Sequence, residues 1–314
     1  MRQIFRVRTP GPYTTVQDRG RISFQHVGVP VSGVLDELAG SVANLLVGNP
    51  REAAVLEMTF SGPCLQVLSE GVVSLTGADM SARVNEKPIL PWRSHAIRAG
   101  DMLFIGSARK GCRGYLAVTG GIEVPLVMGS RSTYVAGRLG GLEGRRLQEG
   151  DILFRGEGES MSRPRRLPWI PAYSDAQTLR VVPGPQDEYF DQKMERFLSS
   201  QYIVTSHADR MGVRLEGPSI QRDPGCPESI VSEPSMPGNI QIPPDGKPII
   251  LLVEQTIGGY AKIATVITPD LWRIAQAKPG DILRFCPVTL DEAHHAYRLW
   301  RAFLEDIAAT LETS

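Results

Sequence analysis

The sequence predicts a mainly β fold with few helices. Glycine (32) and proline (24) are abundant among the 314 residues, and many short apolar runs lie between them. This composition is typical of strands joined by tight turns. One local design occurs at residues 97–104, 147–154 and 277–285, where a Gly-Asp pair supplies a turn and an apolar strand follows at once. Because such turns recur in small barrels, we expect barrel-like sheets.

The length and a second repeat indicate two domains. A chain of 314 residues exceeds the size at which single hydrophobic cores usually stop growing. Residues 8–12 read Arg-Thr-Pro-Gly-Pro and residues 180–185 read Arg-Val-Val-Pro-Gly-Pro, as an internal duplication would produce. The stretch 159–176 is polar and rich in arginine and proline, which is typical of a linker. We expect an N-terminal barrel over residues 1–158 and a C-terminal barrel with a terminal helix over residues 177–314.

Two helices are predicted. Between Leu35 and Val47 the apolar residues follow a 3.6-residue period, with Asp36 in the first turn and Gly48 as a stop. Near the C-terminus, Thr289 and Glu292 have the spacing of a capping box. The helix that follows presents one apolar face, which we expect to pack on a barrel or on a partner subunit. That face consists of Ala293, Tyr297, Trp300, Leu304, Ile307 and Leu311.

Composition excludes several function classes. Lys and Arg number 34 and so do Asp and Glu, so bulk charge gives no case for nucleic acid or an anionic membrane as partner. The four cysteines are far apart and form no C-x-x-C pair, which argues against zinc and against a disulfide scaffold. The histidines lack metal-ligand spacing. Because no uncharged run is long enough to span a bilayer and the N-terminus lacks a signal-like segment, we expect a cytoplasmic protein.

Standard catalytic motifs are absent from the sequence. It contains no phosphate loop, no dinucleotide-binding G-x-G-x-x-G after a strand, no nucleophile elbow and no H-E-x-x-H pair. Ser206, His207 and Asp209 are the residue types of a catalytic triad. Neighbours in sequence rarely point at one another, however, and a triad is assembled in space. We therefore do not assign a triad.

The most informative stretch is residues 254–262, which read Glu-Gln-Thr-Ile-Gly-Gly-Tyr-Ala-Lys between two apolar runs. Paired glycines let backbone N–H groups approach a ligand closely. The polar side chains beside them would surround a place for a carbonyl or carboxylate group. The alternative is an ordinary Gly-Gly hairpin whose polar residues face water. The side chains concerned are Gln255, Thr256, Tyr260 and Lys262.

Other polar clusters also lie beside glycine, and taken singly each is most often a turn stabilised by its own side chains. Together and in this order, the motifs resemble the biotin-dependent carboxyltransferase family, also called the allophanate hydrolase subunit 2 family. The resemblance runs from about Thr15 to the terminal helix. The segments that carry it are Thr15–Arg21, Gly28–Asp36, Ala43–Asn49, Gly129–Tyr134, Asp209–Leu215 and Gln255–Lys262.

The sequence departs from the family pattern around the Gly-Gly turn. Val253 and Glu254 stand where an aspartate and an arginine are expected. Ile257 and Ala261 stand where threonine and proline are expected. Loss of that arginine weakens the case for anion binding at this turn.

The resemblance implies two cyclophilin-like β-barrels with an active cleft between them. The residue pattern gives no support for a metal. Such a cleft must polarise an amide carbonyl and move a proton. By family position and residue type, Tyr260 is a candidate proton relay and Asp18 could orient Arg19 or an acceptor N–H, although Arg131 and Asp18 could equally form a structural salt bridge. The implied catalytic residues are Arg210, Gln255, Tyr260 and Lys262. The implied substrate-binding residues are Asp18, Arg19, Arg131, Ser132, Thr133, Gln241, Thr256, Gly258 and Gly259.

Within this family, the chain resembles most closely the stand-alone C-type component of 5-oxoprolinase, an enzyme that opens the lactam of 5-oxoproline to glutamate with ATP. That interpretation implies partners of the A-type and B-type components, ATP use by the complex and no covalently bound cofactor. A second interpretation is a carboxyltransferase component that acts on urea or a related amide. Biotin would then arrive on a partner, because the chain lacks a lysine flanked by methionines. A third interpretation is a regulatory protein that binds a paralogous partner without catalysis.

Overall fold

The computed structural model describes residues 1–158 and 164–313, so residues 159–163 of the predicted linker lie outside the described residues. The chain divides into two compact units. We call them the N-terminal unit and the C-terminal unit. The N-terminal unit comprises Met1–Ile22, Ser32–Tyr173 and Leu304–Ser314, and the C-terminal unit comprises Ser23–Val31 and Ser174–Phe303.

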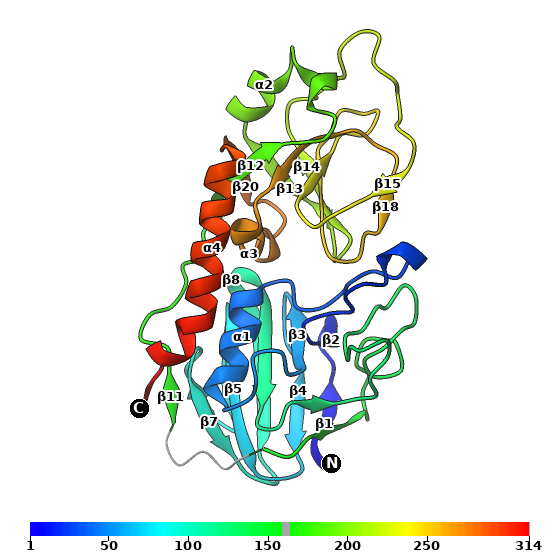
Figure 1. Ribbon diagram of the computed structural model, residues 1–314. Helices are drawn as coiled ribbons and strands as arrows, with labels where there is room; N and C mark the ends of the chain where they lie inside the picture. The colour runs from blue at the N-terminus through cyan, green and yellow to red at the C-terminus, as the bar shows by residue number, and fades with distance from the viewer. Residues whose placement is uncertain (159–163, 314) are drawn as a thin grey trace. The chain divides into compact units, whose positions relative to one another are not determined.

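The N-terminal unit is built on a ten-stranded sheet (Figure 1). Hydrogen bonds connect its strands in the order β2-β3-β8-β4-β1-β10-β9, and β5 pairs with β6, β7 and β8. A short ribbon of β11 (Arg165–Arg166) and β21 (Glu312–Thr313) belongs to the same unit. The strands of the sheet are β1 (Arg2–Thr9), β2 (Tyr13–Gln17), β3 (Val55–Thr59), β4 (Cys64–Val67), β5 (Gly71–Val84), β6 (Lys87–Ile89), β7 (Ser94–Ile97), β8 (Met102–Val118), β9 (Ile122–Glu123) and β10 (Ile152–Arg155).

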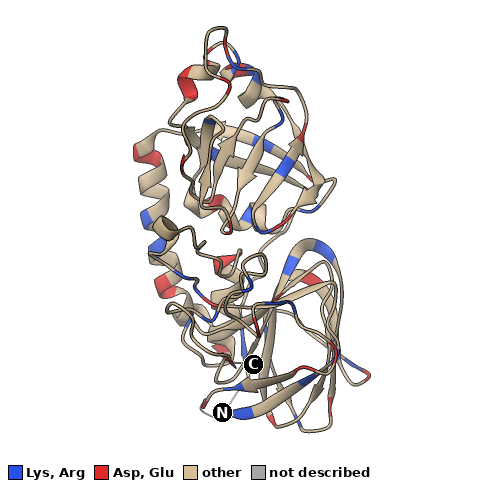
Figure 2. Ribbon diagram, turned by 90° about the vertical axis from the view of Figure 1, so that its right-hand side faces the viewer, with Lys and Arg blue, Asp and Glu red and all other residues tan. Residues whose placement is uncertain are grey.

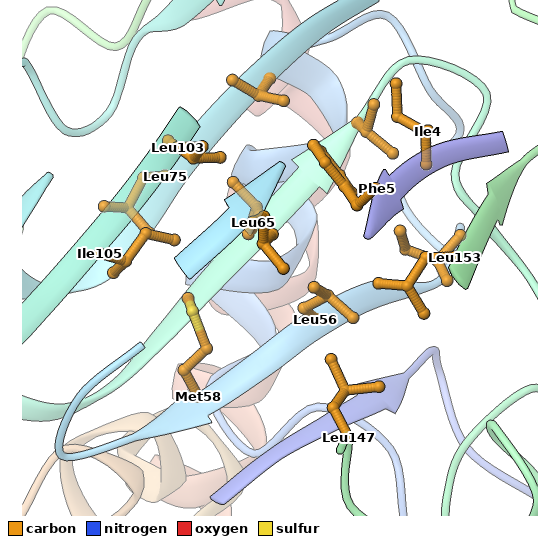
Figure 3. Close-up of a cluster of buried hydrophobic side chains, with 14 of the residues drawn as sticks. Ile4, Phe5, Leu56, Met58, Leu65, Leu75, Leu103, Ile105, Leu147 and Leu153 are labelled. Carbon is orange, nitrogen blue, oxygen red and sulfur yellow. The ribbon is translucent and has the colours of Figure 1, made fainter. Parts of the chain in front are cut away.

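The core of this unit lies inside the curled sheet (Figure 3). Leu56 and Met58 point into it from β3, as their alternation with polar residues predicts. Glu57, on the opposite face of the strand, is also buried, and its Oε2 accepts a hydrogen bond from the Leu35 backbone N–H at 2.9 Å. Phe60, which follows in the same alternation, lies beyond the end of β3 with φ 65° and is 44% exposed. Its left-handed backbone turns the side chain away from the core.

Helix α1 (Glu37–Leu46) confirms the first predicted helix, with ends one or two residues inside the expected ones. Asp36 caps it, because Oδ1 accepts the Ala39 N–H at 2.9 Å. The hydroxyl of Tyr173 donates to Asp36 Oδ2 at 3.1 Å, and the Asp36 N–H donates to the Tyr115 hydroxyl at 2.9 Å. The cap therefore also ties the helix to β8 and to the segment before residue 174.

The C-terminal unit contains a closed barrel with the strand order β12-β19-β16-β17-β14-β13-β20. The barrel closes where β12 and β20 pair in parallel. A two-stranded ribbon of β15 and β18 accompanies it. The strands are β12 (Ala176–Pro183), β13 (Tyr202–Ala208), β14 (Gly212–Glu216), β15 (Glu233–Pro234), β16 (Asn239–Gln241), β17 (Ile249–Leu251), β18 (Ile257–Gly258), β19 (Lys262–Val266) and β20 (Ile282–Pro287).

The remaining elements are short except for the terminal helix α4 (Leu290–Asp306). Its predicted capping box is present, since the Thr289 N–H donates to Glu292 Oε2 at 2.7 Å and the Glu292 N–H donates to Thr289 Oγ1 at 3.2 Å. Of the expected apolar face, Leu304 is fully buried whereas Tyr297 is 44% exposed. The other helices are η1 (Gln25–Val27), η2 (Asp187–Phe190), α2 (Met194–Ser199), η3 (Thr268–Asp270), α3 (Leu271–Ala275) and η4 (Ile307–Thr310).

The three predicted Gly-Asp turns share one geometry. Gly100, Gly150 and Gly280 all have positive φ, at 93°, 88° and 96°. In each turn the aspartate carboxylate accepts the backbone N–H of the residue three positions earlier, at 2.8, 2.7 and 3.0 Å. A strand follows each turn, namely β8, β10 and β20. The sequence repeat therefore reflects a repeated structural device in both units.

Charged residues are distributed as the balanced composition predicts. Figure 2 shows Lys and Arg interspersed with Asp and Glu over the strands and loops of each unit. Within the described residues, no helix has the length and apolar character that a bilayer crossing requires.

Candidate functional site

In the N-terminal unit, the Asp18 carboxylate organises the loop at residues 129–134. Asp18 is 9% exposed and follows the last residue of β2. Its Oδ1 accepts hydrogen bonds from the hydroxyls of Ser130 and Ser132, both at 2.6 Å, and from the Gly20 N–H at 2.8 Å. Its Oδ2 accepts the Arg131 N–H at 2.5 Å. We call these five residues the Asp18 cluster. Both carboxylate oxygens are occupied by protein donors.

The Arg131 side chain does not pair with Asp18, the partner that the sequence analysis considered. Its Nη2 lies 3.1 and 2.8 Å from the two carboxylate oxygens of Glu123. Asp18 meets Arg131 through the backbone N–H instead. The salt bridge therefore exists, but it links Arg131 to Glu123 and not to Asp18.

A buried cation accompanies the Asp18 cluster. Arg21 is fully buried, and it donates from Nε to the Val127 carbonyl at 3.0 Å and from Nη2 to the Ser132 carbonyl at 2.8 Å. Desolvation lowers the pKa of Arg21, which the nearby Asp18 charge partly offsets. Thr133 Oγ1 donates to the Val16 carbonyl at 2.9 Å, whereas Arg19 is exposed. Of the predicted residues, the structure thus gathers Asp18, Arg131 and Ser132 and leaves Arg19 at the surface.

In the C-terminal unit, Arg210 forms an ion pair with Glu254. The Arg210 Nε lies 2.5 Å from Glu254 Oε1, and the side chains are 4% and 6% exposed. Glu254 is one of the positions where the sequence departs from the family pattern. The Glu254 carboxylate therefore balances the positive charge of Arg210, which was predicted to be catalytic.

The Gly-Gly turn is not a simple hairpin. The flanking strands β17 and β19 each pair with β16 rather than with one another. Between them, Ile257 and Gly258 form β18, which pairs with β15. Gln255 Nε2 donates to the Ile257 carbonyl at 2.5 Å, so the amide closes the turn. Tyr260 is 39% exposed, and the Thr256 carbonyl accepts the Ser235 N–H at 2.9 Å.

Lys262 has a buried ammonium group with one acidic partner on the neighbouring ribbon. The side chain is 2% exposed, and its Nζ lies 2.5 Å from Glu233 Oε1. Gln186 joins them, because its Nε2 donates to the same Glu233 oxygen at 3.0 Å and its Oε1 accepts the Lys262 N–H at 3.1 Å. The hydrogen bond from Lys262 is the main cause that lowers the pKa of Glu233 below its ordinary value of 4.5.

Two further polar side chains lie beside Lys262. Gln241 is paired with Lys262 across β16 and β19, so both side chains leave the same face of the sheet. Gln241 is 4% exposed and Ser235 is 3% exposed. Among the described residues, neither Gln241 Nε2 nor Ser235 Oγ has a hydrogen-bond partner. Gly258 faces both atoms, because a β-carbon there would lie 2.3 Å from Gln241 Nε2 and 3.4 Å from Ser235 Oγ.

We call these residues the Lys262 cluster: Gln186, Glu233, Ser235, Gln241, Gly258 and Lys262. Three of them were predicted from the resemblance, namely Gln241, Gly258 and Lys262. The other three, Gln186, Glu233 and Ser235, were not predicted. The position of Gln186 directly after the second Pro-Gly-Pro turn was a usable signal. Glu233 lies in the two-residue strand β15 and Ser235 directly follows that strand, in a stretch without a recognisable motif.

The chemistry of the Lys262 cluster is that of hydrogen-bond donation to an oxygen. An ammonium, a side-chain amide and a hydroxyl are all donors suited to a carbonyl oxygen on which negative charge develops. In the part of the chain that the structure describes, no group of three or more His, Cys, Asp or Glu residues is arranged to hold a metal ion.

Comparison with known proteins assigns the family. Residues 27–287 match the family model described as carboxyltransferase domain, subdomain A and B. The chain is 36% identical over 304 residues to the C component of the 5-oxoprolinase of Escherichia coli strain K12, a match that covers 95% of this chain and 96% of that protein. It is 35% identical over 332 residues to urea amidolyase of Lachancea kluyveri, a match that covers 98% of this chain and 18% of that longer protein.

A solved structure has the same fold. The chain is similar to urea carboxylase of Kluyveromyces lactis with a TM-score of 0.91 and 30% sequence identity, over 97% of this chain and 29% of that chain. The expected mainly β fold with two barrels is therefore confirmed. Because the matched segment and the fold both span most of the sequence, this chain belongs to the biotin-dependent carboxyltransferase family.

Proposed function

We propose that this chain is a component of a 5-oxoprolinase-type complex, which opens the lactam of 5-oxoproline to glutamate at the expense of ATP. The observation that carries the proposal is the match to the C component of 5-oxoprolinase, which covers 95% of this chain and 96% of that protein. By contrast, the chain covers 18% of the urea amidolyase that it resembles. That relative is named as one component of 5-oxoprolinase, which favours a chain that works with separate partners of the A-type and B-type components.

The Lys262 cluster suits the chemistry of lactam opening. In this reaction the amide C–N bond breaks, a water oxygen bonds to the carbonyl carbon, and the released nitrogen takes up protons. Negative charge develops on the carbonyl oxygen during the attack, so positioned donors stabilise the transition state. Lys262, held 2.5 Å from Glu233, supplies a buried ammonium donor whose position the carboxylate fixes. ATP is used by the complex and supplies the free energy.

A second candidate function is transfer of a carboxyl group from biotin on a partner protein to urea or a related amide. The family model and the urea amidolyase and urea carboxylase relatives favour it. A urea carbonyl and a lactam carbonyl present similar oxygen acceptors, so the same donors would serve.

The test is to purify the chain with the products of its neighbouring genes and to measure glutamate released from 5-oxoproline. We expect release with the complete set of components and ATP, and none from the chain alone or from the complete set without ATP. Release by this chain alone, or none from the complete set, contradicts the proposal. Carboxylation of urea with a biotinylated carrier would support the second candidate, and a stable complex with neither activity would support a regulatory role.

A further inference from the structure

We propose that the outer face of the N-terminal sheet binds an acidic surface of a partner protein. Side chains from β1, β4, β5 and β8 that point away from the core form this surface. We call it the arginine face: Arg6, Arg8, Gln66, Arg83, Met102 and Phe104. The choice of partner, a component of the 5-oxoprolinase-type complex, rests on the proposed function. The face itself rests on strand register, exposure and charge.

Strand pairing places these side chains on one side of the sheet. Arg6 pairs with Gln66 across β1 and β4, and Gln66 pairs with Met102 across β4 and β8. Phe104, two residues after Met102, pairs with Arg83 across β8 and β5. Paired residues, and residues two apart in one strand, leave the same side of a sheet. The residues that alternate with them along the strands form the core on the other side, namely Phe5, Val7, Leu65 and Leu103.

The three arginines of the face are exposed, and within residues 1–158 and 164–313 none of them has a carboxylate partner. Arg8 Nη2 donates to the side-chain oxygen of Gln66 at 2.7 Å. The Arg83 guanidinium lies 4.1 Å from the centre of the Phe104 ring. Both of these contacts are with uncharged groups, so the positive charge of the face is not balanced by the chain itself.

Acidic residues border the face, but their own turns engage them. The Asp101 carboxylate accepts the Arg98 N–H at 2.8 Å, and the Asp151 carboxylate lies 2.8 Å from Arg145 Nη1. Like charges beside one another on a sheet destabilise it. Stability alone therefore does not explain a local excess of arginine in a chain whose formal net charge is zero. A carboxylate-bearing partner does, because arginine binds a carboxylate through two parallel hydrogen bonds.

The residues between the arginines favour a protein as the partner. Met102 and Phe104 are half-buried, and Ile152 and Phe154 of β10 continue the same side of the sheet. Arginine, methionine and aromatic residues are enriched at protein interfaces and lysine is depleted, and the arginine face contains no lysine. Single-stranded nucleic acids stack their bases on open aromatic rings, whereas the Arg83 guanidinium covers the Phe104 ring. A second copy of the chain is disfavoured because two arginine faces repel each other.

The experiment measures binding of the full chain to each product of its neighbouring genes by biolayer interferometry. It is done at about 50 mM and about 500 mM NaCl, because salt screens attraction between exposed charges. We expect one component to bind, and the higher salt to weaken that binding by about tenfold or more. Binding by none of the components, or binding that salt does not weaken, overturns the proposal.

Substitutions locate the binding. Arg6→Glu combined with Arg8→Glu should weaken binding of the component by about a hundredfold, because each change replaces attraction by repulsion. Arg214→Glu is the matched control, since Arg214 is an exposed arginine on β14 of the C-terminal unit, and it should bind as the wild type does. Circular dichroism and the Tm check that each variant is folded. Unchanged binding in the folded double variant refutes the proposal.

A milder pair of changes covers the case in which the double charge reversal prevents folding. Arg6→Gln combined with Arg8→Gln removes the charges without reversing them, and it should weaken binding of the component by about tenfold. If this variant is folded and binds as the wild type does, the arginine face is not the binding surface.

Competing occupants of the face give different results. If the wild type retains a short poly-uridine strand, the double variant does not, and component binding is the same in both, the face binds nucleic acid and the proposal is wrong. A dimer of this chain in analytical ultracentrifugation that the double variant loses also overturns it. Component binding that depends on Arg6 and Arg8, in a complete set without 5-oxoproline turnover, refutes the proposed function and leaves the arginine face as a binding surface.

Discussion

The Asp18 cluster and the Lys262 cluster are both buried, polar and rich in residues that the family resemblance singles out. They differ because the carboxylate at the centre of the first has all its positions occupied, whereas the second contains uncharged donors without an acceptor. The two oxygens of Asp18 accept two hydroxyls and two backbone N–H groups. In the Lys262 cluster, Ser235 Oγ and Gln241 Nε2 find no acceptor among the described residues. A carboxylate saturated by its own chain stabilises a loop, whereas uncharged buried donors without an acceptor suit a ligand. Arg131 Nε, at the edge of the Asp18 cluster, also finds no acceptor among the described residues. The comparison predicts that substitution of Asp18 changes stability and that substitutions in the Lys262 cluster change activity.

The largest effect is expected at the ion pair between Arg210 and Glu254. As at Asp18, the charged groups of this pair are occupied by protein partners. Glu254→Gln keeps the shape but removes the charge that faces Arg210 Nε at 2.5 Å. Removing one partner of a buried ion pair lowers the free energy of unfolding by about 3 to 5 kcal/mol. Urea denaturation measures it. The control Glu216→Gln, in an exposed pair with Lys247, should have an effect near zero.

If Glu254→Gln retains full stability and instead loses turnover, Arg210 belongs with the ligand-binding residues. The distinction between saturated and available polar groups would then fail for this pair.

The next effect in size is expected from Lys262→Met. The substitution keeps the length of the side chain and removes the buried ammonium, so turnover of 5-oxoproline by the complete complex should fall by about a hundredfold or more. Stability should change little, because Glu233 is 37% exposed and can be hydrated without its partner. The measurement is glutamate release with assembly checked by gel filtration. Lys247→Met, which removes a partly exposed lysine from the same unit, serves as the matched control.

Retention of full activity by Lys262→Met would remove this cluster from the reaction. The same would hold if the substitution prevented assembly without affecting the activity of the complexes that do form.

A smaller change in stability is expected at Asp18. Asp18→Asn replaces one acceptor oxygen by an NH2 group, which cannot accept the hydrogen bonds that the cluster directs at it. We expect the free energy of unfolding to fall by about 2 kcal/mol. Thermal or urea unfolding measures it. Normal stability combined with lost substrate binding would show instead that Asp18 contacts the substrate, as the resemblance implies.

The smallest effect is a pH dependence from Glu233. The pKa of Glu233 is lowered in the folded protein, mainly by the Lys262 hydrogen bond, so the charged carboxylate stabilises the fold above the unfolded value of 4.5. That contribution is lost as the pH falls through the lower, folded pKa. In a pH series of unfolding curves, Glu233→Gln should reduce the loss of stability below about pH 4.5. Identical acid profiles for the two proteins would contradict this role.

The sequence predicted features whose residues lie close together along the chain better than features whose residues lie far apart along it. The Gly-Asp turns and the Thr289–Glu292 capping box involve residues at most a few positions apart, and local rules predicted them. The ties between Asp18 and Ser132 and between Lys262 and Glu233 join residues 114 and 29 positions apart. Local rules cannot predict such pairs, because only the folded sheet brings them together.

The resemblance predicted positions but not partners. It placed Gln241, Gly258 and Lys262 in the site, and the structure brings these three together. It gave no reason to include Ser235, because a serine in a loop has no distinguishing pattern until its burial is known. Conversely, Gln255 was expected to face a ligand, but its amide donates to the Ile257 carbonyl two residues away.

The pairing of β12 with β20, which closes the C-terminal barrel, has a consequence for folding during synthesis. Residues 176–181 of β12 pair with residues 282–287 of β20. The barrel strands that come first and last along the chain are therefore hydrogen-bonded neighbours. During synthesis β12 leaves the ribosome long before its neighbour exists, and its edge stays open meanwhile. Closing so large a loop is slow because contacts distant in sequence must form late. A nascent chain that stops before residue 282 therefore leaves one edge of β12 and one edge of β13 unpaired, and unpaired strand edges favour aggregation.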